Sequence, residues 1–419
     1  MDARTELPQE IFDKIIDEVS NDDQILKSCA LASNSFRPRS QKHLFSFITL
    51  DKSLSCDRLY PLLTENPRLC TYIHDILLMI DQETDPQWLS VNKNLSCILD
   101  MLTSLCACSI SIFNEIDWKD IHPQTTAALF RVFAVPSLAS IDILGLYGIP
   151  VTFFDIPNVL EQLVLKSVSF ARTLDAGTTS PRSLCMTALD FSPDAKAFVN
   201  QESDTAFALT AYPDACFSHI TDLRIRASRD NLPILLPILN AAAKSLTSLE
   251  LNHSYAEHEY RDDRGLNTFR FNLANLTNLT RLSFHFTIYF HTFHDLPSTF
   301  LTSAQHLTTV LAASASTLAR IETLTVTFKP YDLHSSYEIS MVQSFSEFDV
   351  WGPLDKAICH DRSSARLRVS IVLSMEIPKL AQLVEARNLW QELMRGKFPM
   401  LEERGTVTLE VESSVPNDT

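Results

Sequence analysis

The chain has 419 residues, enough for two or three ordinary domains or one long array of repeats, and 45% of them are hydrophobic. Its net charge of −16 at pH 7 repels the phosphate backbone of nucleic acids and anionic lipid surfaces. The seven glycines are scattered, and the segment Gly145-Leu146-Tyr147-Gly148 lacks the third glycine and the lysine of a phosphate-binding loop. We therefore expect no nucleic-acid partner and no nucleotide or other cofactor.

Nine cysteines are spread singly along the chain, and only Cys106 and Cys108 lie close together. This pattern is typical of small core residues in a reducing compartment. Residues 1–9 lack the apolar stretch of a signal peptide, and no segment approaches the roughly 18 continuous apolar residues of a membrane span. The sequence predicts a cytoplasmic or nuclear protein that does not bind a membrane.

The first fifty residues predict three short helices. An amphipathic helix begins at the Leu-Pro pair of the segment 7–19, since proline suits the first helical position. Polar residues 20–23 end it and supply caps for a second helix over 25–32, and a third begins at Pro38 before 47–50 turns extended. Three short helices bury little apolar surface alone, so this unit needs a partner or an adjoining domain.

The runs 7–16, 26–36 and 39–48 together resemble the F-box family, particularly the degenerate form abundant in filamentous fungi. The shared features are a Leu-Pro start, an Ile-rich first helix, a second helix with Leu-Lys-Ser-Cys-Ala, and an aromatic residue after it. Ser33 stands where the family often has cysteine, and Phe36 where it usually has tryptophan.

The resemblance implies that a Skp-family adaptor contacts the Leu-Pro start and the apolar side chains of these helices, and that the adaptor links the chain to a cullin ubiquitin ligase. The contact residues that it implies are Leu7, Pro8, Ile11, Ile15, Ile16, Leu26, Leu31 and Phe36. The alternative interpretation is that residues 7–50 form a helical cap on the domain that follows.

Beyond residue 50, an apolar-x-x-apolar-x-apolar frame recurs nine times. Its last members are Leu78, Ile112, Ile143, Leu165, Phe191, Ile225, Leu251, Phe284 and Val326. The frame arises often by chance in so apolar a chain, and its alternation with helical segments at 94–105, 125–135, 231–243 and 299–318 carries most of the prediction.

This alternation predicts an α/β fold that partly resembles leucine-rich repeats. The consensus asparagine after the frame is absent, and small polar residues such as Ser228 and Ser254 stand in its place. We predict a three-helix F-box domain over residues 1–50 and an irregular leucine-rich-repeat-like solenoid over 51–412, with a parallel sheet on its concave face. Residues 413–419 are predicted to be a polar tail.

Residues 253–270 interleave charges with tyrosines directly after a repeat strand, which predicts a loop that binds a target protein. The residues proposed for this contact are Tyr255, Glu257, Tyr260, Arg261 and Arg264. The alternative is a solvated loop without a partner. Residues 330–349 are predicted to be a second long connection.

Histidines between positions 253 and 306 suggest a metal site, but their spacing does not support one. His253, Glu257 and His258 nearly follow an inverted zincin order, with three rather than two residues between the first two. His291 and His294 have no cysteine pair nearby, and the chain contains no Gly-x-Ser-x-Gly elbow. We expect no metal ion, no catalytic residue and no enzymatic activity.

The predicted function is that of a substrate-recognition adaptor in a Skp/cullin/F-box ubiquitin ligase. The N-terminal helices would bind the Skp-family adaptor, and the repeats would hold a target protein. A second hypothesis is a leucine-rich-repeat scaffold that binds a protein without a ligase role. A metal-dependent enzyme built on the histidine-rich middle is the third.

Overall fold

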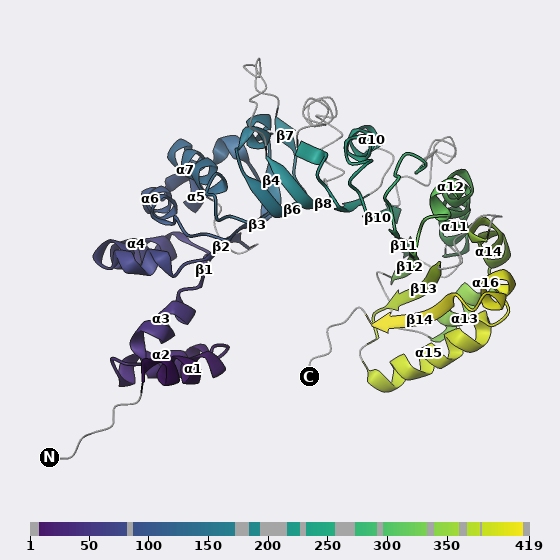
Figure 1. Ribbon diagram of the computed structural model, residues 1–419, viewed down its shortest axis with the longest axis horizontal. Helices are drawn as coiled ribbons and strands as arrows, with labels where there is room; N and C mark the ends of the chain where they lie inside the picture. The colour runs from purple at the N-terminus through teal and green to yellow at the C-terminus, as the bar shows by residue number, and fades with distance from the viewer. Residues whose placement is uncertain are drawn as a thin grey trace. The chain divides into compact units, whose positions relative to one another are not determined.

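The computed structural model describes residues 8–81, 87–171, 184–192, 216–226, 232–255, 273–290, 296–332, 339–359, 367–377 and 379–413. The fold is α/β with a large parallel sheet, in which twelve strands follow the order β1-β2-β3-β4-β6-β8-β9-β10-β11-β12-β13-β14 (Figure 1). These strands are β1 (Phe47–Leu50), β2 (Asp75–Ile80), β3 (Ala107–Asp117), β4 (Ser140–Tyr147), β6 (Val159–Lys166), β8 (Cys185–Ser192), β9 (Asp222–Arg226), β10 (Ser248–Tyr255), β11 (Arg281–Phe290), β12 (Thr323–Asp332), β13 (Arg368–Met375) and β14 (Val407–Ser413). A separate parallel pair is formed by β5 (Ile149–Pro150) and β7 (Phe170–Ala171).

Helices lie between several of these strands along the chain. The α-helices are α1 (Gln9–Glu18), α2 (Asp23–Ala32), α3 (Arg37–Leu44), α4 (Ser53–Glu65), α5 (Trp88–Val91), α6 (Lys93–Met101), α7 (Pro123–Phe133), α10 (Leu232–Ala241), α11 (Leu296–Ala313), α12 (Ala315–Leu318), α13 (Ile339–Glu347), α14 (Trp351–Ile358), α15 (Leu380–Met394) and α16 (Pro399–Glu403). Three 3₁₀ turns are η1 (Pro67–Thr71), η2 (Trp118–Asp120) and η3 (Val151–Asp155).

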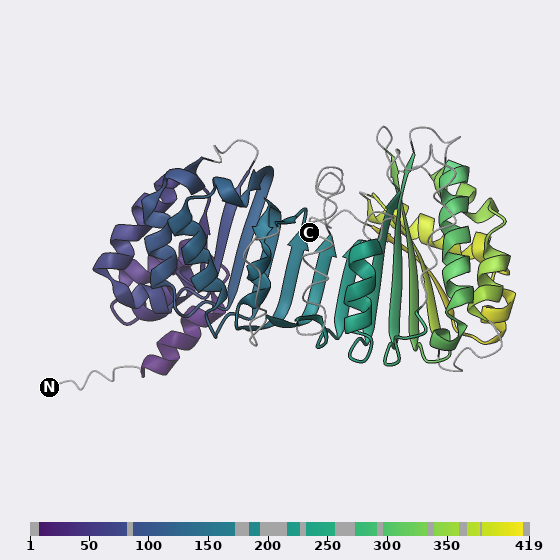
Figure 2. The ribbon, with the colours of Figure 1, turned by 90° about the horizontal axis from the view of Figure 1, so that it is seen from above.

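The chain divides into two compact units. The first consists of residues 1–187 and 192–208, and the second of residues 188–191 and 209–419. Within the first unit, α4, α6 and α7 lie on one face of the strands, and within the second, α10, α11 and α14 do the same (Figures 1 and 2). Each unit therefore has its own core between one face of its strands and its helices.

The repeated apolar frame sets the register of the strands. Its last residues pair directly along the second unit, as Phe284 does with Leu251 and Val326, because this row of side chains is buried beneath the helices. At β3 the predicted frame is wrong by two residues. Ile110, not Ile112, pairs with Leu78, because the cysteine at position 108 fills a fully buried place in the frame.

The same backbone contact recurs where strands begin. One carbonyl accepts two successive N–H groups of the next turn of the chain, as Thr221 O does from Thr247 N at 2.9 Å and Ser248 N at 3.0 Å. Five further carbonyls each accept two N–H groups in this way, namely those of His74, Cys106, Ala139, Thr247 and Thr280. At these junctions the contact holds the start of one strand against the start of the next in an equivalent place.

A buried carboxylate joins two elements of the second unit. Asp355 on α14 is 1% exposed and accepts N–H groups from Met400 at 2.9 Å and Leu401 at 3.1 Å, at the start of α16. An aromatic cluster around Trp351 fills the adjoining core, with Trp390 and Phe398 edge-on to it. The predicted connection at 330–349 is wrong in part, because α13 lies there and buries Phe345 in this cluster.

Candidate protein-binding site

Helix α1 starts where the sequence predicts it, but its apolar residues divide into two groups. Ile16 is fully buried, and Phe12 packs edge-on against Phe36 with 5.3 Å between the ring centroids. Ile11 and Ile15 are 44% and 49% exposed. Because these two residues lie four apart, they form one ridge on the outer side of the helix.

Helix α2 also leaves large apolar side chains in solvent. Its first turn is held by Asp22, whose Oδ1 accepts the N–H groups of Gln24 and Ile25 at 2.9 Å each. Leu26 is 1% exposed, whereas Leu31 is 84% exposed and Ile25 43%. Exposure of this size on two short helices is typical of a surface that binds another protein.

Exposed apolar side chains are concentrated at this end of the chain. Among the described residues, fourteen large apolar side chains are exposed, and seven of them lie between Ile11 and Leu62. These seven are Ile11, Ile15, Ile25, Leu31, Phe47, Leu54 and Leu62. The first unit therefore has most of its exposed large apolar side chains in its N-terminal part, between Ile11 and Leu62.

The residues predicted to contact the adaptor fall into three groups in the structure. Pro8, Ile11, Ile15 and Leu31 are exposed, and Phe36 is half-buried. Ile16 and Leu26 are buried, so their side chains hold the helices together and do not reach the surface. Leu7 lies outside the described residues.

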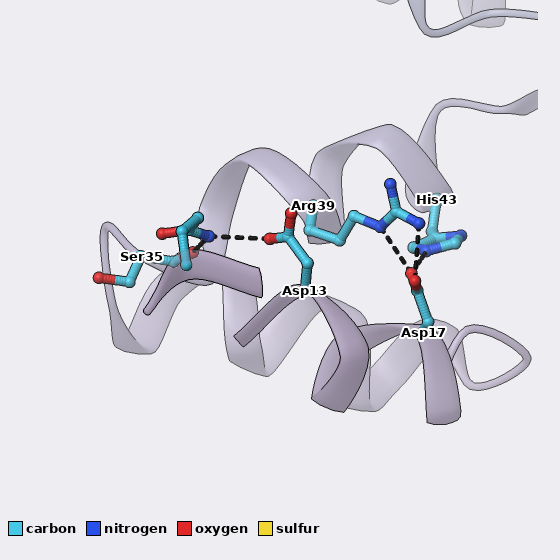
Figure 3. A network of polar contacts seen from close by, with 6 residues as sticks. Asp13, Asp17, Ser35, Arg39 and His43 are labelled. Atoms are coloured by element: carbon cyan, nitrogen blue, oxygen red, sulfur yellow. Dashed lines mark hydrogen bonds and ion pairs between the residues drawn. The ribbon is translucent and has the colours of Figure 1, made fainter. Parts of the chain in front are cut away.

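A polar network fixes α1 against α3 (Figure 3). The carboxylate of Asp17 accepts two hydrogen bonds from Arg39, at 2.6 Å from Nε and 2.7 Å from Nη2, and lies 2.6 Å from Nε2 of His43. The hydrogen bonds from Arg39 and His43 lower the pKa of the Asp17 carboxyl to about 2. At the N-terminal end of α1, the Nε2 of Gln9 donates a hydrogen bond to the carbonyl of Ser35 at 2.8 Å.

The second unit carries a charged cluster on the strand residues that alternate with the buried frame. Arg224 lies 3.5 Å from Glu250 and 3.8 Å from Asp222, while His285 lies 3.7 Å from Glu250 and Arg281 lies 3.9 Å from Asp222. Burial lowers the pKa of His285, although the neighbouring Glu250 acts in the opposite direction. This cluster was not predicted from the sequence. The charged residues that stand between the apolar residues of the strand frames could have indicated it.

The predicted target-binding loop cannot be placed beside this cluster. Glu257, Tyr260, Arg261 and Arg264 lie outside the described residues, and of Tyr255 only the backbone at the end of β10 is described.

The sequence features considered for catalysis have structural roles where they are described. His253 stacks on Phe286 at 6.0 Å, and burial lowers the pKa of His253 to about 3, with contributions from His306 and Arg226. Gly145 has a φ of +75°, and a Cβ there would lie 1.9 Å from the Ile112 carbonyl oxygen, so close strand packing explains this glycine.

Metal ligands do not gather in the described part of the chain, where no group of three or more His, Cys, Asp or Glu side chains could hold an ion. Glu257, His258, His291 and His294 lie outside that part. None of the described helices combines the length and the apolar character that crossing a membrane requires.

The fold and the exposed helix surface together define the chain as an α/β protein with a large parallel sheet and an apolar N-terminal surface. No known family model matches the chain, and a search of curated proteins finds no match either.

Proposed function

We propose that the chain is a substrate-recognition adaptor of a Skp/cullin/F-box ubiquitin ligase. The observation that carries the proposal is the exposed isoleucine ridge of Ile11 and Ile15 on α1, the first of three helices whose order and spacing resemble an F-box. Burying such a ridge against a partner stabilises a complex by about 25 cal/mol for each Å² of apolar surface removed from water. Pro8 and the strongly exposed Leu31 extend the surface that the partner would cover.

In this proposal, the repeats form a leucine-rich-repeat-like solenoid that holds the target protein. The recurring strand frame and the recurring two-donor contact at the strand starts support repeated units. The chain performs no chemistry itself. It raises the concentration of the target beside the ubiquitin-carrying enzyme, which turns a bimolecular transfer into a nearly intramolecular one.

The proposal places the protein in the cytosol or nucleus, where such ligases act. All nine cysteines are free thiols, which agrees with a reducing compartment.

The test is binding of the full chain to a purified Skp-family adaptor, with Ile11→Asp and Ile15→Asp as the perturbations. Both positions are exposed, so the charges leave the fold intact and lower adaptor affinity at least tenfold each, because an isolated charge at the centre of an apolar contact is costly. Val91→Asp is the matched control, since Val91 on α5 is 70% exposed and lies outside the three helices.

Three results would count against the proposal. No complex, under conditions in which a control F-box protein binds the same adaptor, rejects the ligase role and favours the scaffold hypothesis. Loss of the whole fold in Ile11→Asp favours the helical-cap interpretation. Stoichiometric metal in protein purified without added metal revives the enzyme hypothesis.

A further inference from the structure

Polar side chains of α1 contact α3 and the residues just before it, and Gln9 also donates to Asp13 within α1 at 2.8 Å. Gln9, Asp13 and Asp17 follow one another at four-residue intervals, and so do Ser35, Arg39 and His43. Residues four apart lie on one stripe of a helix, so the stripe on α1 can face Arg39 and His43 of α3, while Ser35 lies just before that helix. The contacts between the two sets are those of the Gln9 side chain with the Ser35 carbonyl at one end and of Asp17 with Arg39 and His43 at the other (Figure 3). We call these six residues the polar zipper.

The zipper lies on the side of α1 opposite the isoleucine ridge. At about 100° per residue, the stripe through Asp13 is rotated by about 180° from Ile11 and Ile15. Phe12 and Ile16 lie between the two and supply the buried contact with the other helices. The helix thus has a buried apolar side flanked by an exposed apolar ridge and a polar stripe.

Hydrophobic burial alone does not favour this rotation of α1. A roll of about 100° would move Ile11 and Ile15 into the places of Phe12 and Ile16 and turn those two toward α3, so that the two exposed isoleucines would lose their solvent contact. The same roll would separate Asp17 from Arg39 and His43 and break a bidentate, charge-assisted pair. The zipper therefore opposes the rotation that would hide the ridge.

We infer that Asp17 is a positioning residue for partner binding, which holds α1 in the rotation that presents Ile11 and Ile15. This role rests on the proposed function, because the adaptor is the partner to which the ridge would be presented. Asp17 itself faces α3 and acts through the isoleucines. Its contribution to binding is therefore expected to disappear when the ridge is removed.

A first experiment needs no partner. Ile15→Cys is introduced into a chain whose exposed or half-buried cysteines, Cys29, Cys97, Cys106 and Cys185, are changed to serine, and the rate of its reaction with a thiol reagent is measured. We expect Asp17→Ala to lower that rate several-fold while far-ultraviolet circular dichroism is unchanged. The exchanged pair Asp17→Arg with Arg39→Asp should restore part of the rate, because the ion pair is remade. An unchanged rate in Asp17→Ala overturns the inference, and so does a faster one, which would mean that the helices have opened.

The second experiment measures adaptor affinity. Asp17→Ala should weaken adaptor binding about tenfold in the native chain. In a chain that already carries Ile15→Ala it should weaken binding less than twofold, because Asp17 acts by positioning the Ile15 side chain that this chain lacks. Asp23→Ala is the matched control, because Asp23 is 74% exposed and its ion pair among the described residues is with Lys27 of the same helix, at 3.8 Å. It should change affinity less than twofold.

The outcomes separate the two proposals. Equal tenfold losses in both chains would mean that Asp17 contacts the adaptor directly, and would overturn the positioning role. If the labelling rates change as expected but the native chain binds no adaptor, the zipper still holds the rotation of α1, and the proposed function is the part that fails.

Discussion

The buried carboxylate of Asp355 offers the sharpest test of how the second unit is held together. It lies on α14, and its two oxygens accept the N–H groups of Met400 and Leu401, 45 and 46 residues later in the chain. These N–H groups belong to the first turn of α16, where the helix cannot supply acceptors of its own. Replacing Asp355 with alanine removes both acceptors at once.

The cost follows from how little water can replace the carboxylate. Leu401 is 1% exposed, so its N–H is left without an acceptor, which costs about 1–3 kcal/mol. Met400 is 38% exposed, so water can reach that residue, and the loss there is that of a helix cap, about 1 kcal/mol. We expect Asp355→Ala to lower the unfolding free energy by about 2–4 kcal/mol, and Asp355→Asn by about half as much, because one amide oxygen still accepts.

Hydrogen exchange measured by mass spectrometry reports the loss of stability in each unit separately, peptide by peptide. Peptides from α14 and α16 should open more easily in Asp355→Ala, while peptides from α6 and α7 keep their protection. Asp100→Ala is the matched control, because Asp100 also makes two bonds, to Arg131 at 2.7 and 2.9 Å, but both side chains are exposed and the expected cost is under about 1 kcal/mol. Equal losses in the two variants would refute the assigned role of burial.

Two further predictions concern single residues of the core. Gly145→Ala should destabilise the first unit by about 2 kcal/mol or more, because it combines a positive φ with a clash at the Ile112 carbonyl. Gly352→Ala should be neutral or stabilising, because a Cβ added there meets no neighbouring side chain or backbone within 4 Å. Urea unfolding of the two variants compares these free energies. His253 is neutral in the folded chain, with a pKa of about 3, and takes up a proton in the unfolded chain below its ordinary pKa of 6.5. The second unit should therefore lose stability as the pH falls from about 6.5 toward 3, and His253→Phe should reduce that loss; an unchanged pH profile would contradict it.

The sequence predicted the positions of the elements better than the roles of their side chains. Helical spacing located α6 and α7, and the apolar frame located the strands, because burial on one face imposes a period that local sequence records. The same periodicity predicts one amphipathic helix over 7–19, in which Ile11 and Ile16 belong to a single apolar stripe. Which part of that stripe is buried depends on where α3 lies, and spacing along α1 carries no information about that.

Contacts between residues far apart in the chain were beyond sequence reasoning. The sequence around Asp355 gave no sign of its role, since its partners lie 45 and 46 residues away. Arg39 and His43 gave no sign of Asp17 until α1 and α3 were placed side by side. The zipper did leave a weak signal, namely polar residues at four-residue intervals along α1 and from Ser35 into α3, and a search for such intervals would have found it.

The central claim is that the N-terminal helices bind a Skp-family adaptor, and a titration of the full chain with that adaptor tests it most directly. We predict a saturable one-to-one complex with a dissociation constant below about 1 μM. In this complex residues 8–19 gain protection from hydrogen exchange, and the Ile15→Asp chain does not form it. No binding at about 50 μM, where a control F-box protein binds the same adaptor, would contradict the account. So would full affinity in the Ile15→Asp chain.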